Sequence, residues 1–158
     1  KMSLVVKDGS IVSGANTYVT LEEFKAFADK RGLSHGDDAA VTKSIHRAMD
    51  FFERQTFIGF KANENQPLQF PRTEAMIDGY YIDADEIPKE VKDALFEAIF
   101  VQESGNSQLN TEDRKTLREK VGDIEVTYAN NSENRVTTPA LTFALSKIVR
   151  PAYEVMRA

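Results

Sequence analysis

Residues 88–104 of the chain read PKEVKDALFEAIFVQES and predict a helix with apolar side chains on two of its faces. Pro88 suits the first helical position, where a fixed φ and a missing N–H carry no cost, and Gly105 follows the end. Phe100 lies nearly opposite the main apolar stripe, and Phe96 also lies outside it. A small domain must bury both faces, within its own chain or against another subunit. The main stripe consists of Val91, Ala94, Leu95, Ala98 and Ile99.

Two earlier helices carry clear start signals. Thr20 and Glu23 form a capping-box pattern, and Gly32 marks the end of the helix that follows. Asp37 and Asp38 suit the free N–H groups at the start of a second helix, which runs to about Arg54. One stripe of this second helix predicts core positions at Val41, Ile45, Ala48, Met49 and Phe52.

The last predicted helix has Thr138 as its N-cap and Pro139 at its first position. Its apolar stripe is interrupted by Pro151, and Phe143 lies on the other side of the helix. Residues 152–158 contain Tyr153 and Met156, whereas a terminal segment exposed to solvent is more often polar. We therefore predict that this segment adheres to another surface. The stripe consists of Leu141, Leu145, Ile148 and Ala152.

Two segments complete the fold prediction. Residues 57–87 are too interrupted by Gly and Pro for a long helix and too aromatic for a linker, so they predict an ordered loop packed on the helices. Residues 121–128 alternate as a strand, with residues 4–6 or 11–12 as candidate partners. The predicted fold class is mostly α, a bundle of about four helices with a small β element. We expect a single domain over residues 1–150 and a docking tail at 151–158.

The composition of the chain disfavours several classes of function. The chain has 158 residues, 41% of them hydrophobic, and a formal charge of −5, whereas broad nucleic-acid surfaces are normally basic. It contains no cysteine, which excludes disulfides and thiolate sites. Its N-terminal apolar run is too short for a signal peptide or a membrane span, so we expect a soluble protein without a membrane partner.

Charge is distributed unevenly along the chain. Residues 74–97 hold eight acidic residues against two lysines, a balance of −6, whereas residues 140–158 have a balance of +2. Acidic and basic surfaces of neighbouring copies can meet head to tail, although a solvated acidic helix face is the commoner cause of such a run. The acidic run includes Asp83, Asp85 and Glu86.

No pattern in the sequence predicts catalysis or cofactor binding. His35 and His46 lack metal-type spacing and a nucleophile partner, and we expect both to be solvated. Asp83-x-Asp85-Glu86 lacks the remaining ligands of a calcium loop, and the glycines form no phosphate-binding motif. We therefore expect no enzyme activity, no catalytic residues, no metal and no cofactor.

Two short stretches interleave aromatic rings with basic side chains, as single-strand binding requires. They are Phe57-Ile58-Gly59-Phe60-Lys61 and Gln69-Phe70-Pro71-Arg72. Apolar rings usually partition into the core, so the favoured interpretation of Phe57, Phe60 and Phe70 is that they anchor the long loop.

Six short strings occur in a fixed order along nearly the whole chain. They are GANTYVT at 14–20, FIGFK at 57–61, QPLQFPR at 66–72, DGY at 78–80, IPKEVKDA at 87–94 and REKVGDIEVTY at 118–128. Together they resemble a family of small tailed-bacteriophage proteins labelled "DnaT-like single-stranded DNA-binding", which is similar to head-tail adaptor (head-completion) proteins. The family usually has Trp where Phe70 stands here.

This resemblance implies a structural virion protein at the head-tail interface, present in the host cytoplasm during assembly. Such a protein forms a ring of copies of itself, typically a dodecamer, beneath the portal. It extends the channel through which duplex DNA passes transiently, and it docks the next neck, stopper or tail protein. The residues proposed to dock the portal protein are Phe143, Ile148, Pro151, Tyr153 and Met156. Those proposed for the subunit interface are Phe96, Phe100, Asp83, Asp85 and Glu86.

The family label also supports an alternative. Taken literally, it implies a replication accessory that holds single-stranded DNA through Phe60, Lys61, Phe70 and Arg72. This hypothesis predicts a salt-sensitive complex with oligonucleotides, whereas the adaptor hypothesis predicts little affinity for DNA at physiological salt.

Overall fold

The computed structural model describes residues 3–105, 118–121, 124–127 and 138–150. Four helices and three small antiparallel strand pairs make a mostly α fold, as predicted. The predicted docking tail at 151–158 lies outside the described residues. The elements are α1 (Leu21–Lys30), α2 (Asp38–Phe52), β1 (Phe60–Lys61), β2 (Arg72–Thr73), β3 (Met76–Ile77), β4 (Tyr80–Tyr81), α3 (Lys89–Glu103), β5 (Arg118–Val121), β6 (Ile124–Thr127) and α4 (Pro139–Ser146).

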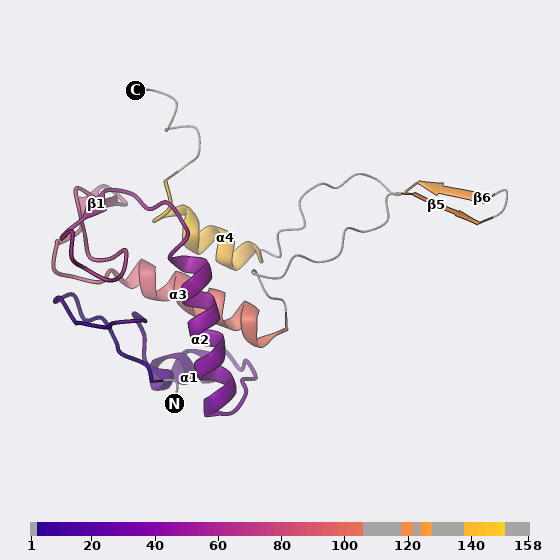
Figure 1. Cartoon of the computed structure of the whole chain (residues 1–158), viewed down its shortest axis with the longest axis horizontal. Coiled ribbons are helices and arrows are strands. Elements are labelled where there is room, and N and C mark those ends of the chain that lie inside the picture. Colours follow the sequence, from indigo (N-terminus) through magenta and orange to yellow (C-terminus); the bar gives the residue numbers. More distant parts are fainter. Residues whose placement is uncertain (1–2, 106–117, 122–123, 128–137, 151–158) are drawn as a thin grey trace, which may run out of the picture.

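Helix α3 packs against α1, α2 and α4, and Figure 1 shows it crossing α2. All five residues of its predicted stripe are fully buried. Its second face is covered by the same chain: the Phe96 ring stacks on Phe27 with centroids 4.8 Å apart, and Phe100 packs half-buried against the core. The expectation that Phe96 contacts another subunit is therefore corrected, because α1 already covers its ring.

The helix starts follow the predicted capping chemistry. The Thr20 hydroxyl accepts the Glu23 N–H at 3.0 Å, and the Glu23 carboxylate accepts the Thr20 N–H at 2.8 Å, which confirms the capping box. Asp37 caps α2 by accepting the Ala40 N–H, and Thr138 caps α4 with Pro139 as the first helical residue. Helix α3 begins one residue later than predicted, since Pro88 is its N-cap.

The end of α4 is joined to the segment that follows α2. The Ile148 carbonyl accepts the Ile58 N–H at 3.0 Å, and the Arg150 N–H donates to the Thr56 carbonyl at 2.8 Å. Ile148 is fully buried, so its predicted role in portal docking is corrected: its side chain fills the core. Phe143, on the outer side of α4, is 77% exposed.

The long loop between α2 and α3 is ordered and packed on the helices, as predicted. Its first half pairs β1 with β2, and its second half pairs β3 with β4. Asp78 and Gly79 connect β3 to β4 with φ of 51° and 89°. Two consecutive left-handed residues are typical of the two-residue turn that matches the twist of a hairpin.

The strand predicted at 121–128 is β6, but its partner is neither of the two predicted segments. It pairs with β5, with Val121 opposite Ile124, so that only Gly122 and Asp123 lie between the two strands. Pairing with an immediate neighbour closes a much shorter loop than pairing with the N-terminal segment, and it costs correspondingly less chain entropy.

Residues 3–17 form an extended lead-in to α1, in which Val6 makes a β-bridge with Thr17. Lys7 is buried, and its ammonium group donates to the Ser10 carbonyl. Gly9, with φ of 110°, lies so close to the start of α3 that a β-carbon there would stand 1.9 Å from the Asp85 carbonyl oxygen. This contact holds the lead-in against the residues preceding α3.

Candidate nucleic-acid interface

The outward face of α2 carries four polar side chains at helical spacing: Lys43, His46, Arg47 and Asp50. Residues three, four and seven apart lie on one side of a helix, so these groups are neighbours. They occupy the side of α2 opposite its buried stripe, all five residues of which lie in the core as predicted. The buried stripe thus fixes the direction of the polar one.

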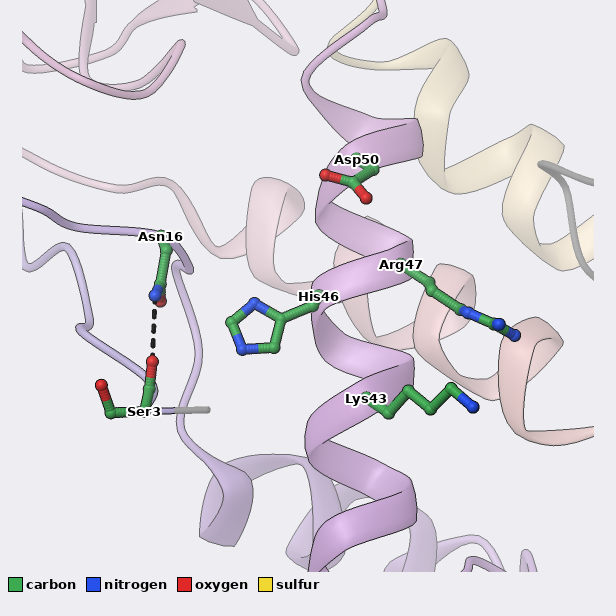
Figure 2. A pocket seen from close by; sticks show the side chains of 6 residues that line it. All are labelled: Ser3, Asn16, Lys43, His46, Arg47 and Asp50. Atoms are coloured by element: carbon green, nitrogen blue, oxygen red, sulfur yellow. Dashed lines mark hydrogen bonds between the residues drawn. The ribbon is translucent and has the colours of Figure 1, made fainter. Parts of the chain in front are cut away.

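These four side chains form a pocket together with Ser3 and Asn16 of the lead-in, with a volume of about 440 Å³. Figure 2 shows His46 pointing from α2 toward Asn16, and Asp50 one turn further along the helix. The Asn16 amide donates to the Ser3 carbonyl at 3.0 Å, and its oxygen accepts the Val5 N–H at 2.9 Å. Asn16 therefore holds the opposite wall of the pocket in place.

Lys43 and Arg47 are exposed, and neither has an ion-pair partner among the described residues. The ammonium groups of Lys25, Lys89, Lys92 and Lys147 pair with Asp38, Asp93, Glu23 and Asp78, respectively. Other exposed cations of the described part, among them Lys30 and Lys61, also have no ion-pair partner. Lys43 and Arg47 differ from them in being neighbours on one helix face, and two adjacent cations on a chain of charge −5 favour an anionic ligand there.

His46 departs from the sequence expectation of a solvated side chain. It is half-buried, and its Nε2 atom is buried without a hydrogen-bond partner within the described structure. His35 is also half-buried, with its Nε2 atom 3.5 Å from the Asp29 carboxylate. A buried imidazole nitrogen without a partner is costly, which makes the base of the pocket the place where a ligand or water would add a hydrogen bond.

The four residues predicted to hold single-stranded DNA, Phe60, Lys61, Phe70 and Arg72, lie in two different environments. Phe60 is 59% exposed and Lys61 is also exposed, so the expectation that Phe60 anchors the core is wrong. Phe57 and Phe70 are buried, as expected of rings that anchor the loop. Phe70 therefore presents no ring face to a DNA base.

Arg72 is only 8% exposed because its guanidinium is bound to the loop itself. Its Nε donates to the Ile58 carbonyl at 2.7 Å and one terminal nitrogen donates to the Gly59 carbonyl at 2.8 Å. The other terminal nitrogen donates to Gln69, to the side-chain oxygen at 3.0 Å and to the backbone carbonyl at 3.3 Å. With most of its donors engaged, Arg72 is a structural residue and not a phosphate contact.

A buried polar network explains why Phe70 is fixed where it is. The Tyr18 hydroxyl donates to the Glu53 carboxylate at 2.5 Å and accepts the Phe70 N–H at 3.1 Å. The other Glu53 oxygen accepts the Gln69 N–H at 2.9 Å. Burial raises the pKa of the Glu53 carboxyl above its usual value of 4.5, despite these hydrogen bonds, and burial also raises the pKa of Tyr18.

Four of the remaining predicted site residues lie in the described part of the chain, and all four are exposed. Asp83, Asp85 and Glu86 are exposed, as a subunit interface requires, and their proposed role stays a prediction. Phe143 is exposed on α4. Pro151, Tyr153 and Met156 lie outside the described residues.

Sequence reasoning missed the residues that line the pocket and the two exposed tyrosines, Tyr80 and Tyr81. The spacing of Lys43 and Arg47 on the polar side of α2 is a usable signal for a cationic helix face. Nothing in the sequence predicts that Ser3 and Asn16 close the other side, because that contact depends on how the lead-in folds back.

Metal-binding and membrane-spanning features are both absent from the described ranges. No group of three or more His, Asp or Glu side chains there could hold a metal ion. No helix in that part of the chain has the length and apolar character needed to cross a membrane.

One comparison with known proteins gives a match. The family model described as "Putative DnaT-like ssDNA binding protein" matches residues 2–158. No curated protein and no solved structure matches the chain.

Proposed function

Since the chain belongs to the DnaT-like ssDNA-binding family, we propose that it is a binding protein for single-stranded DNA and that the pocket on α2 is its contact site. The observation that best supports this proposal is that Lys43 and Arg47 are exposed, adjacent on α2 and without an ion-pair partner among the described residues, in a chain of net negative charge. Cationic side chains that follow a strand's phosphates supply most of the affinity of proteins that bind DNA without sequence preference.

The outward face of α2 offers different chemistry on its two sides: Figure 2 shows Lys43 and Arg47 pointing to one side of the helix and His46 to the other, toward Asn16. Lys43 and Arg47 lie one helical turn apart and suit phosphate oxygens, for which the planar guanidinium is a bidentate donor. The carboxylate of Asp50 repels phosphate but accepts hydrogen bonds from base amino groups. We expect the strand's phosphates to lie over the Lys43–Arg47 side, with a base edge directed toward Asp50.

The proposal differs from the single-strand alternative in the residues that make contact. Phe70 and Arg72 are committed to the loop, so they contribute to DNA binding only by holding the fold. With two cations at the site, the affinity falls only shallowly with salt, with a slope of about −1.4 in log K against log salt.

Fluorescence anisotropy with a labelled oligothymidine at low and moderate salt tests this proposal. We expect salt-sensitive binding that the double variant Lys43→Gln/Arg47→Gln weakens about tenfold or more. The matched control is Lys30→Gln/Lys61→Gln, which removes the same charge from exposed positions on α1 and β1 that also have no ion-pair partner in the described part of the chain. Absence of binding at low salt, or equal weakening by the control, would contradict the proposal.

A second candidate function, the head-tail adaptor, is favoured by a different observation. Phe143 is 77% exposed on α4, so its ring is available for contact with a partner protein. In this function Phe143 and the tail at 151–158 dock on a portal protein, copies of the chain form a ring, and a neck, stopper or tail protein binds beyond it. The protein performs no chemistry in either function.

Electron microscopy of the protein mixed with its cognate portal tests the adaptor function. Added annular density is the expected result, and Phe143→Ser should remove it while leaving DNA binding unchanged. Portal particles that gain no density would leave single-strand binding as the function of this chain.

A further inference from the structure

The second half of the long loop exposes three large side chains on one two-stranded hairpin, with Tyr80 on the opposite face from Met76 and Tyr81. Tyr80 is 80% exposed, Tyr81 is 74% exposed and Met76 is 46% exposed. Met76 lies directly opposite Tyr81 in the β3–β4 pair, so the two side chains share one face of the hairpin. Large rings on a short hairpin do not stabilise the fold at these exposures, and they indicate a surface that another molecule covers.

The charged residues that flank the hairpin in the sequence are acidic, and most of them have no ion-pair partner within the described structure. Glu74, Asp83, Asp85 and Glu86 are exposed, and in the described part of the chain their carboxylates have no cationic partner. Only Asp78, in the turn of the hairpin, is neutralised, by Lys147 of α4 at 2.8 Å. We call Met76, Tyr80, Tyr81 and these four free carboxylates the hairpin surface.

This combination of groups selects the chemistry of the partner. Unpaired carboxylates repel phosphates, so a nucleic acid is disfavoured on the hairpin surface even though exposed rings could stack on bases. A guanidinium group satisfies both features at once, because it stacks on the face of a tyrosine ring and donates two parallel hydrogen bonds to a carboxylate. An ammonium group supplies the charge without the planar face.

We propose that the hairpin surface is a docking site for an arginine-bearing segment of a partner protein. Arginine side chains stack on Tyr80 and Tyr81 and pair with carboxylates of the Asp83–Glu86 segment. Met76 supplies apolar contact for the aliphatic part of the arginine side chain. The site is independent of the pocket on α2, which carries the opposite charge.

Titration with fluorescently labelled hexa-arginine and hexa-lysine peptides at low and physiological salt tests the proposal on the full chain. We expect hexa-arginine to bind more tightly than hexa-lysine. Tyr80→Ala/Tyr81→Ala should weaken hexa-arginine binding about five- to tenfold, since each exposed cation–π contact accounts for about two- to fivefold. Tyr80→Phe/Tyr81→Phe keeps both ring faces and should retain the affinity.

The charge contribution has its own matched pair of variants. Asp83→Asn/Glu86→Gln should weaken hexa-arginine binding severalfold, whereas Glu22→Gln/Asp29→Asn, which removes two exposed carboxylates from α1, should leave it unchanged. Equal weakening by both double variants would show non-specific attraction and overturn the proposal. So would hexa-arginine binding that survives loss of both tyrosine rings, or binding of oligothymidine that depends on Tyr80 and Tyr81.

The same titration separates this proposal from single-strand binding. Lys43→Gln/Arg47→Gln should leave hexa-arginine binding intact, because those positions lie on α2 outside the hairpin surface. Loss of peptide binding in that variant, with the fold retained by circular dichroism, would contradict the assignment of the peptide to the hairpin.

Discussion

The two halves of the loop between α2 and α3 contain similar residues and use them in opposite ways. In residues 57–73, Phe57 and Phe70 are buried and Arg72 is bonded to backbone carbonyls. In residues 74–87, Tyr80 and Tyr81 are exposed and several carboxylates have no partner in the described structure. The first half buries two of its three aromatic rings, with Phe60 exposed, whereas both tyrosines of the second half are exposed. Aromatic and charged residues therefore indicate a binding surface only when the rings are exposed and the charged groups have no partner within the protein.

The largest stability effect that separates the two halves is expected at Arg72. Arg72→Ala removes the buried guanidinium and leaves the partly buried carbonyls of Ile58 and Gly59 without this donor, so we expect a loss of about 3 kcal/mol in the free energy of unfolding. Arg72→Lys should restore only part of the free energy of unfolding, because an ammonium group lacks the planar array of N–H donors that a guanidinium group has. Urea unfolding followed by circular dichroism measures both variants. A loss below about 0.5 kcal/mol for Arg72→Ala would mean that the first half of the loop is not anchored through this side chain.

An intermediate effect is expected from Glu53, as a dependence of stability on pH. Burial raises the pKa of Glu53 above 4.5, so the folded state binds more protons than the unfolded state between 4.5 and the raised value. The free energy of unfolding therefore falls as pH rises through that window. Glu53→Gln should be less stable at every pH, since an amide cannot accept from both Tyr18 and Gln69, and it should lack this fall.

Urea midpoints measured at closely spaced pH values, for the parent chain and for Glu53→Gln, check this expectation. The difference between the two curves isolates the contribution of Glu53 from that of the other carboxylates. A difference that stays constant with pH would contradict a raised pKa at this position.

The smallest stability effect is expected in the second half of the loop. Tyr80→Ala and Tyr81→Ala should each change the free energy of unfolding by less than about 0.5 kcal/mol, because both side chains are mostly solvated. Urea unfolding of the same protein batches that are used for peptide titration measures these changes in stability and compares them with the loss expected for Arg72→Ala. A large loss of stability would instead assign these rings to the fold.

The elements that sequence reasoning predicted correctly share a local physical cause. The Thr20–Glu23 capping box, the Asp37 cap and the Thr138–Pro139 start are each determined within a few residues. The buried stripes of α2 and α3 follow from spacing along one helix. These features need no knowledge of how distant segments meet.

Besides the strand partner of β6 and the burial of His46, three wrong predictions concern which surface covers an apolar residue. The spacing of Phe96 identifies a second apolar face on α3 but does not say whether α1 or another subunit lies against it. Ile148 was expected to dock a partner, and it is covered by the chain's own core. Phe60 was expected in the core, although the β1–β2 pairing directs it outward.

The candidate site could be predicted only in part. The cationic spacing of Lys43 and Arg47 is visible in the sequence, whereas the wall formed by Ser3 and Asn16 depends on the fold of the lead-in. Asp78-Gly79 is a strong hairpin signal that identifies the β3–β4 turn, and Gly122-Asp123 is a similar signal between β5 and β6.

The close approach of Gly9 to the Asp85 carbonyl has a practical consequence for handling this protein. The lead-in supplies one wall of the α2 pocket and is also pressed against the residues that carry the acidic groups before α3. An affinity tag or fusion partner that displaces the segment upstream of Asn16 would therefore disturb both the proposed α2 pocket and the proposed hairpin surface. Reagents for the assays above are better immobilised through engineered attachment points on the outer side of α1.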